Sequence, residues 1–184
     1  MYIASQKRKE NVAEYLLYMW QIEDMIRANN LDLDKIKANV IDRFNGLSEA
    51  QRKEMTEWYE SLIDMMRREG IEKSGHLQMN RNVMNELVEL HRALLQDPRF
   101  SEYSALFYRT LPYIVDLRAR AGEAAEGEIE TCFTALYGML LLRLQSKEIS
   151  NETATAIGQI SKFIATLSAY FHKNEREPLF APKD

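Results

Sequence analysis

Cysteine is nearly absent from this chain of 184 residues, since Cys132 is the only one. A single thiol excludes an internal disulfide framework and a metal site built from several cysteines, and it is typical of a reducing compartment. We therefore expect a cytoplasmic protein. Because the apolar residues Phe133 and Leu136 lie close to Cys132 in the sequence, we interpret this cysteine as a small buried residue rather than a nucleophile.

Long apolar runs and a concentrated basic segment are also missing. No segment approaches the roughly 18 apolar residues that span a bilayer, and residues 1–10 contain no apolar core of a signal peptide. The formal net charge is -4, the pI is near 5.5, and the basic clusters at 7–9 and 67–68 lie beside acidic residues. These features predict neither a membrane partner nor a nucleic acid partner.

Glycine and proline are scarce, with seven and four residues, whereas 46% of the chain is apolar. Strand-rich folds usually need more of both residues for their turns. Apolar residues recur three and four positions apart, and no stretch alternates cleanly between apolar and polar residues. The predicted fold is all-α: a bundle of six to eight helices in one domain, 1–184, with a soft hinge at 71–75 and an extended tail at 175–184.

Capping signals place several helix ends. Ser48 and Gln51 form a capping box that opens one helix, and Gly70 closes it. The pair at 29–30, Asn-Asn, ends the first helix, and Asn-Gly at 45–46 ends the second. The predicted helices cover about 7–28, 33–44, 48–70, 76–96, 128–146 and 150–174, with one more starting at Pro98.

The helix that starts at Pro98 contains a second proline, Pro112, which removes a backbone donor and clashes with the preceding turn. We expect this helix to break or bend sharply between Tyr108 and Tyr113. Aromatic residues near such a break can line a pocket, although aromatic residues at helical spacing more often simply pack. The aromatic residues thus either only pack or line a small-molecule pocket near Pro112 that His91 or Arg143 approaches; both interpretations stay open.

Two adjacent carboxylates, Glu23 and Asp24, follow a dense apolar stretch on the first helix. Three interpretations stay open: a solvated helix edge, an ion pair with a distant arginine, or a ligand-binding site. An unpaired buried carboxylate costs several kcal/mol, so a buried one recruits a partner. Arg143 is the first choice for that partner, and Arg109 or Arg118 is the next.

Motifs of known chemistry are missing from the sequence. Helical metal sites use Glu-x-x-His or His-Glu-x-x-His patterns, and neither occurs. The glycine groupings lack the Gly-Lys-Ser ending of a phosphate loop, and no Gly-x-Ser-x-Gly elbow is present. We predict no catalytic residues, no cofactor and no metal, and we lean against an enzyme. The candidate buried polar or ligand-lining residues are Glu23, Asp24, His91, Tyr108 and Arg143.

The last predicted helix carries two apolar stripes. Large residues form one stripe, which is expected to face the core: Ile157, Ile160, Ile164, Leu167 and Phe171. Small residues form the other stripe: Ala154, Gly158, Ser161, Ala165 and Ser168. A stripe of small residues permits close approach of a second helix, either within the chain, beside Gly138, or across a two-fold axis in a dimer.

Three stretches carry a resemblance to a known family: ENVAEYLLYMWQIEDMIRA at 10–28, SKEIS at 146–150 and ISKFIATLSAY at 160–170. Together they resemble the proteins of Bacteroidetes bacteria grouped as domain of unknown function family 4924. The resemblance implies an all-helical bacterial protein and supplies no catalytic residues to carry over. The leading hypothesis is a non-enzymatic interaction protein that self-associates or binds another protein. The alternative is a small-molecule-binding protein or enzyme.

Overall fold

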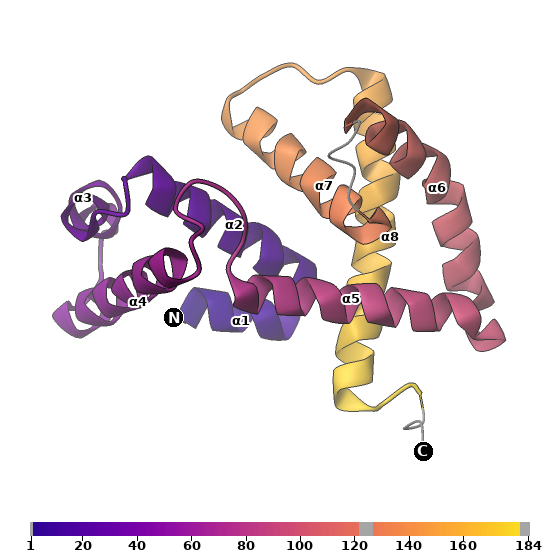
Figure 1. Cartoon of the computed structure of the whole chain (residues 1–184), viewed down its shortest axis with the longest axis horizontal. Coiled ribbons are helices and arrows are strands. Elements are labelled where there is room, and N and C mark those ends of the chain that lie inside the picture. The colour runs from indigo at the N-terminus through magenta and orange to yellow at the C-terminus, as the bar shows by residue number, and fades with distance from the viewer. Residues whose placement is uncertain (1, 122–126, 181–184) are drawn as a thin grey trace.

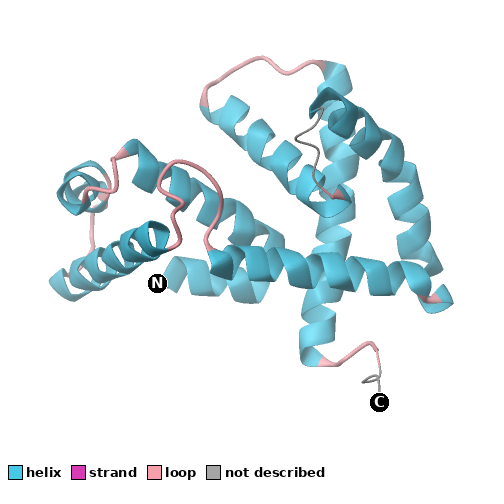
Figure 2. Ribbon diagram, in the orientation of Figure 1, coloured by secondary structure: helices cyan, strands magenta, loops and turns pink. Residues whose placement is uncertain are grey.

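The computed structural model describes residues 2–121 and 127–180, and every regular element among them is a helix (Figures 1 and 2). The predicted fold class, an all-α bundle of six to eight helices, is confirmed. None of the described helices combines the length and the hydropathy of a transmembrane span. The α-helices are α1 Tyr2–Glu10, α2 Val12–Ala28, α3 Leu33–Asn39, α4 Glu49–Arg68, α5 Gln78–Gln96, α6 Ser101–Ala121, α7 Glu128–Leu144 and α8 Asn151–Arg176, and the 3-10 helices are η1 Ile41–Arg43 and η2 Pro98–Phe100.

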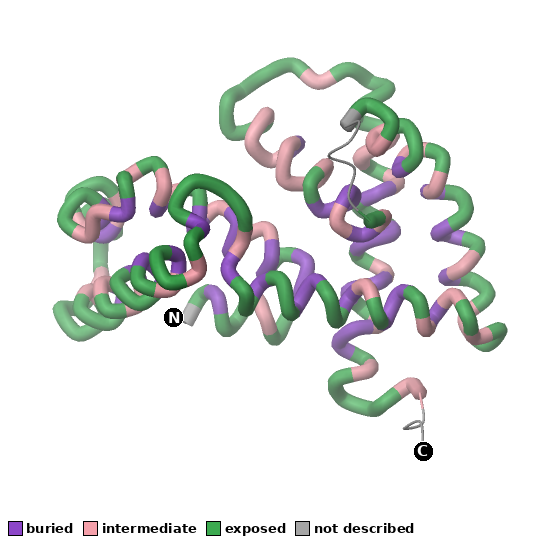
Figure 3. The backbone as a smooth tube through the Cα atoms, viewed as in Figure 1, coloured by how far each residue is buried: buried purple, intermediate pink, exposed green. Residues whose placement is uncertain are grey.

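Helix α8 is the central packing element of the C-terminal half, because it contacts α2, α5, α6 and α7 (Figure 1). Its stripe of large residues is buried from Ile160 to Phe171, while Ile157 is half-buried (Figure 3). At the other end of the molecule, α3 and α4 pack together. Helix α2 connects the two regions, since it contacts α1, α5, α7 and α8.

The first predicted helix is two helices, so the expectation of one helix over 7–28 is wrong at Asn11. The backbone of Asn11 is extended, and its side chain accepts hydrogen bonds from the N–H groups of Ala13 and Glu14, which caps α2. The N–H group of Val12, the first residue of α2, donates to His172 Nε2 at 3.0 Å. An asparagine that caps a new helix competes with continuation of the preceding one.

The predicted ends of α4 are confirmed. The Ser48 hydroxyl accepts from the Gln51 N–H while the Gln51 side chain accepts from the Ser48 N–H, which is the expected capping box. Gly70 follows the C-terminal cap with φ +66°. The second predicted helix is shorter than expected, because α3 ends at Asn39 and the chain continues as η1.

Helix α6 runs without interruption through Pro112, so of the expected break or sharp bend between Tyr108 and Tyr113, the break is wrong. The α6 ribbon is curved in the C-terminal part of the helix (Figure 1). Pro112 is exposed to solvent, and the Thr110 hydroxyl bonds the Leu106 carbonyl at 2.9 Å. A helix absorbs a proline on its outer face by bending, because the carbonyl that loses its partner can turn to water.

Candidate functional site

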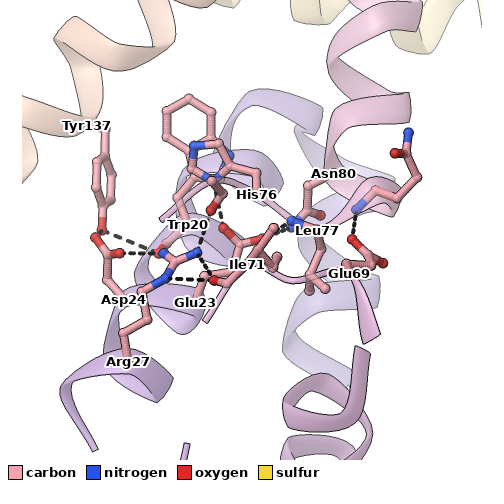
Figure 4. A network of polar contacts seen from close by, with 12 residues as sticks. Trp20, Glu23, Asp24, Arg27, Glu69, Ile71, His76, Leu77, Asn80 and Tyr137 are labelled. Atoms are coloured by element: carbon pink, nitrogen blue, oxygen red, sulfur yellow. Dashed lines mark hydrogen bonds and ion pairs between the residues drawn. The ribbon is translucent and has the colours of Figure 1, made fainter. Parts of the chain in front are cut away.

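The most polar buried position of the fold is Glu23 on α2, whose carboxylate is fully buried and accepts three hydrogen bonds (Figure 4). Its Oε1 accepts from the Leu77 N–H at 3.0 Å and from the Asn80 side-chain amide at 2.7 Å. Its Oε2 lies 2.6 Å from His76 Nδ1. Asn80 is itself held by the Tyr15 hydroxyl, 3.2 Å from its Oδ1. Both oxygens of the buried carboxylate therefore have hydrogen-bond partners.

These contacts also have a structural role at the start of α5. The residue at the N-cap position, Leu77, has no side-chain acceptor of its own. Glu23 binds the Leu77 N–H, and Glu69 at the end of α4 binds the next N–H, that of Gln78, at 2.6 Å. Two carboxylates, one from α2 and one from the end of α4, thus cap α5 and lie at the positive end of its dipole.

His76 links the buried carboxylate to solvent. Its ring stacks on Trp20, with centroids 4.1 Å apart and an interplanar angle of 11°. A carboxylate has no proton to donate, so we assign the donated proton to His76 Nδ1. The Nε2 atom has no protein partner in the described part of the chain, and 36% of the side chain is exposed. His76 thus presents one imidazole edge outward from a fixed ring orientation.

Asp24 lies beside this network but faces solvent, with 49% of its side chain exposed. It pairs with Arg27 on the same helix at 2.8 Å, and it accepts from the Tyr137 hydroxyl of α7 at 2.6 Å. Burial, followed by the bond to Asp24, raises the pKa of the Tyr137 phenol. Arg27 also donates to the carbonyls of Ile71 and Gly75, so it fastens the 71–75 connection to α2.

The expected pairing of these acids with a distant arginine is wrong for the residues that the structure describes. Asp24 uses Arg27, three residues away, and Glu23 uses His76. Arg143 is exposed near the end of α7, Arg118 pairs with Glu128, and Arg109 is exposed on α6. An imidazole 53 residues away satisfies the buried carboxylate without the burial of a guanidinium.

A pocket of about 380 Å³ opens beside the Glu23–His76 pair. Helix α5 supplies most of its wall, α2 contributes one aromatic ring, and α7 contributes one acid. The lining residues are Trp20, His76, Gln78, Asn80, Arg81, Met84, Asn85 and Glu130. Polar groups from α5, α7 and the connection before α5 thus converge on this cavity.

The other sequence candidates lie elsewhere. His91 is 4% exposed, its Nδ1 lies 2.7 Å from the Tyr103 hydroxyl, and its ring packs edge-on against Phe107 and Phe163. Burial lowers the pKa of His91 to about 4, so it is a neutral core residue at physiological pH. Tyr108 is 62% exposed on the outer side of α6. Neither residue lines the pocket beside His76.

A second concave surface, the α2–α7–α8 groove, has a volume of about 500 Å³. Its lining includes the half-buried Leu17 of α2 and Leu140 of α7. From α8 it includes the stripe of small residues, of which Ala154, Gly158, Ser161 and Ala165 are exposed. A Cβ atom added at Gly158 would meet no atom within 4 Å. These four residues thus form an open wall of the groove, whereas Ser168 at the end of the stripe is buried and bonds Asn11.

The described residues contain neither a cluster of metal ligands nor an activated thiol. No group of three or more His, Cys, Asp or Glu side chains is placed to hold a metal ion there. Burial raises the pKa of the Cys132 thiol to about 12, so the thiol stays protonated at neutral pH.

The fold and the site together define an all-helical bundle with a buried carboxylate–histidine pair at the N-terminus of one helix. The chain belongs to the family described as domain of unknown function (DUF4924), whose model matches residues 1–178. The resemblance of the three sequence stretches to this family is confirmed. No curated protein and no solved structure gives a significant match to the chain.

Sequence reasoning included Glu23 but missed the residues that complete the site: Trp20, His76, Asn80, Arg81 and Tyr137. The available signal was local. His76 follows Gly75, directly before a helix whose N-cap position is an apolar leucine. Such a helix start needs capping groups from elsewhere in the chain.

Proposed function

We propose that this protein is a non-enzymatic helical interaction module that self-associates through the α2–α7–α8 groove. The observation that carries the proposal is the exposed part of the small-residue stripe on α8, which is bordered by leucines in the groove: Ala154, Gly158, Ser161 and Ala165. A solvated helix face usually carries Lys and Glu rather than Gly, Ala and Ser. The occupant that we propose is a second copy of this chain.

The apolar character of the surface extends beyond the groove. Leu136 and Leu140 are half-buried on the groove side of α7, and Leu144 at the end of that helix is 69% exposed. Gly158 leaves open space where a partner helix could approach closely. Burial of such leucines gains roughly 1.5 to 3 kcal/mol each when it is complete. This combination suits helix-to-helix packing across an interface.

The charges of the groove favour a two-fold arrangement. Arg143, in the last turn of α7, lies near the start of α8, because residues 145–150 alone separate the two helices. Glu14 is in the first turn of α2, and Asn11 bonds Ser168 in the C-terminal half of α8. Glu14 and Arg143 therefore lie toward opposite ends of the α2–α7–α8 groove. Antiparallel pairing of two copies places each Glu14 opposite the partner's Arg143.

The first test separates the interface from internal packing. Gly158→Leu with Ala165→Leu should abolish the dimer in sedimentation while the circular dichroism spectrum stays that of the parent, because neither position is covered in the protomer. Thr155→Leu with Thr166→Leu, on the flank of α8 outside the groove, is the matched control and should leave the dimer intact. A monomeric parent protein would contradict the proposal.

A charge exchange tests the orientation. Glu14→Arg and Arg143→Glu, each alone, should weaken the dimer because like charges then face each other. The double variant should restore the dimer, since opposite charges meet again. Equal dimerisation of all four proteins would rule out the antiparallel arrangement.

We also propose a cytoplasmic location. Its support is the single cysteine, which is buried and stays a thiol, as expected in a reducing compartment. Fractionation of cells that express the protein should recover it in the cytoplasmic fraction. Recovery in a membrane or extracellular fraction would contradict this part of the proposal.

A further inference from the structure

We propose that the pocket beside Trp20 and His76 binds a small zwitterion of the amino acid type, which carries one carboxylate and one ammonium group. This pocket is separate from the α2–α7–α8 groove, since the two share no lining residue. The inference therefore stands independently of self-association.

The carboxylate of such a ligand has donors on one wall, the guanidinium of Arg81 and the amide of Asn85. Arg81 lines the pocket from α5, and its guanidinium donates to the Gln78 side chain at 2.6 Å but has no acidic partner in the described chain. His76 lies on the same wall, and with its proton on Nδ1 its Nε2 is an acceptor rather than a donor. Trp20 and Glu23 hold the ring in place. Asn85, one turn after Arg81, adds an amide that can donate. A guanidinium with spare donors is the preferred partner of a carboxylate.

The ammonium group has an acceptor on the other wall. Glu130, in the first turn of α7, lines the same pocket and makes no ion pair with a described residue. Arg81 and Glu130 thus contribute opposite charges to one cavity without using each other as partners. A ligand with only a negative charge leaves Glu130 unpaired and repelled, and a ligand with only a positive charge does the same to Arg81.

Size and shape also favour a small ligand. A volume of about 380 Å³ lies at the lower end of the roughly 300–1,000 Å³ of small-molecule sites. Met84 and the outer face of the His76 ring provide apolar surface for a side chain. The ring cannot swing away, because Trp20 covers its inner face and Glu23 fixes Nδ1. A preformed wall loses little conformational freedom on binding.

The test is calorimetric titration of the full chain with each of the twenty common amino acids in turn. Acetate and methylammonium chloride serve as probes of a single charge. At least one amino acid should bind, and both single-charge probes should bind at least tenfold more weakly. Arg81→Gln and Glu130→Gln should each weaken binding by about tenfold or more, the size expected for loss of a charge-assisted hydrogen bond.

Matched controls lie on α5 outside the pocket. Arg92 and Glu89 are exposed and line neither surface, so Arg92→Gln and Glu89→Gln should bind like the parent. No heat with any amino acid at 10 mM overturns the proposal. So does binding that survives both pocket substitutions, because the site would then lie elsewhere. Acetate binding as tight as that of the amino acid would reduce the site to a simple anion subsite and would also overturn it.

Discussion

Substitution of Glu23 by alanine should destabilise the fold far more than substitution of its neighbour Asp24. Glu23 is fully buried and caps α5 from α2, whereas Asp24 is half exposed and pairs within its own helix. The two acids are adjacent in sequence, and their side chains differ by a single methylene group. A large difference between the variants therefore reports the environment of the two carboxylates.

The magnitude follows from the donors left behind. Glu23→Ala orphans the Leu77 N–H and the Asn80 amide, both buried, and each buried unsatisfied donor costs about 1–3 kcal/mol. Relief of the buried charge offsets part of this cost, and His76 can turn its exposed edge to water. A net loss of about 3 kcal/mol is expected, which is about 1 M in urea midpoint for a domain of this size. Asp24→Ala removes an exposed pair and should cost about 1 kcal/mol or less.

Urea denaturation followed by circular dichroism at 222 nm measures both variants under the same conditions. A conservative change refines the result. Glu23→Gln keeps an oxygen for Leu77 and Asn80 and offers an N–H to His76 Nδ1, which requires the imidazole proton to move to Nε2. It should lose less than half of the alanine effect, and ring-nitrogen NMR should report the changed tautomer. Equal midpoint shifts for Glu23→Ala and Asp24→Ala would refute the capping argument.

Other predictions follow from buried groups. The folded chain holds the His91 pKa near 4 instead of 6.5, so the unfolded chain binds the proton more readily and the unfolding free energy should fall as pH drops from about 6.5 to 4; His91→Phe should flatten this part of a urea-midpoint profile. Cys132, with its pKa raised to about 12, should resist Ellman's reagent at pH 8 until urea unfolds the chain. Asn11→Ala should cost about 1 kcal/mol through loss of the α2 cap, and Asn45→Ala, at an exposed position without a cap, should cost almost nothing.

Helix existence and type could be predicted because they depend on signals within a few residues. The capping box at Ser48 and the glycine at 70 operate over one turn, and both ends of α4 are where the sequence places them. Asn11 was harder, since it interrupts a continuous apolar pattern. Its capping conformation is supported by Ser168 and His172, about 160 residues away. The choice between a break and a bend at Pro112 was open for a related reason, because whether a proline splits or only bends a helix depends on whether its outer face reaches solvent.

The candidate site depends on contacts that no local pattern records. Glu23 meets His76 across 53 residues, and Asp24 meets Tyr137 across 113. Sequence reasoning established that a buried carboxylate must recruit a partner, and it then chose an arginine by charge alone. The structure uses a histidine because the loop after α4 returns the chain to α2 at this point. The path of the chain, rather than the charge of the side chain, thus determines that His76 is the partner of Glu23.

The opposite fates of Glu23 and Asp24 come from the position of α2 in the bundle. Successive residues of an α-helix point about 100° apart, and α2 has packing partners on several sides, including α5 and α7. One residue step therefore turns a side chain from the start of α5 to the edge of α7 and solvent. On a helix with one apolar stripe, the hydrophobic pattern separates such neighbours in advance. On α2 the pattern is apolar on more than one face, so the partner helix alone decides which acid is buried and bonded.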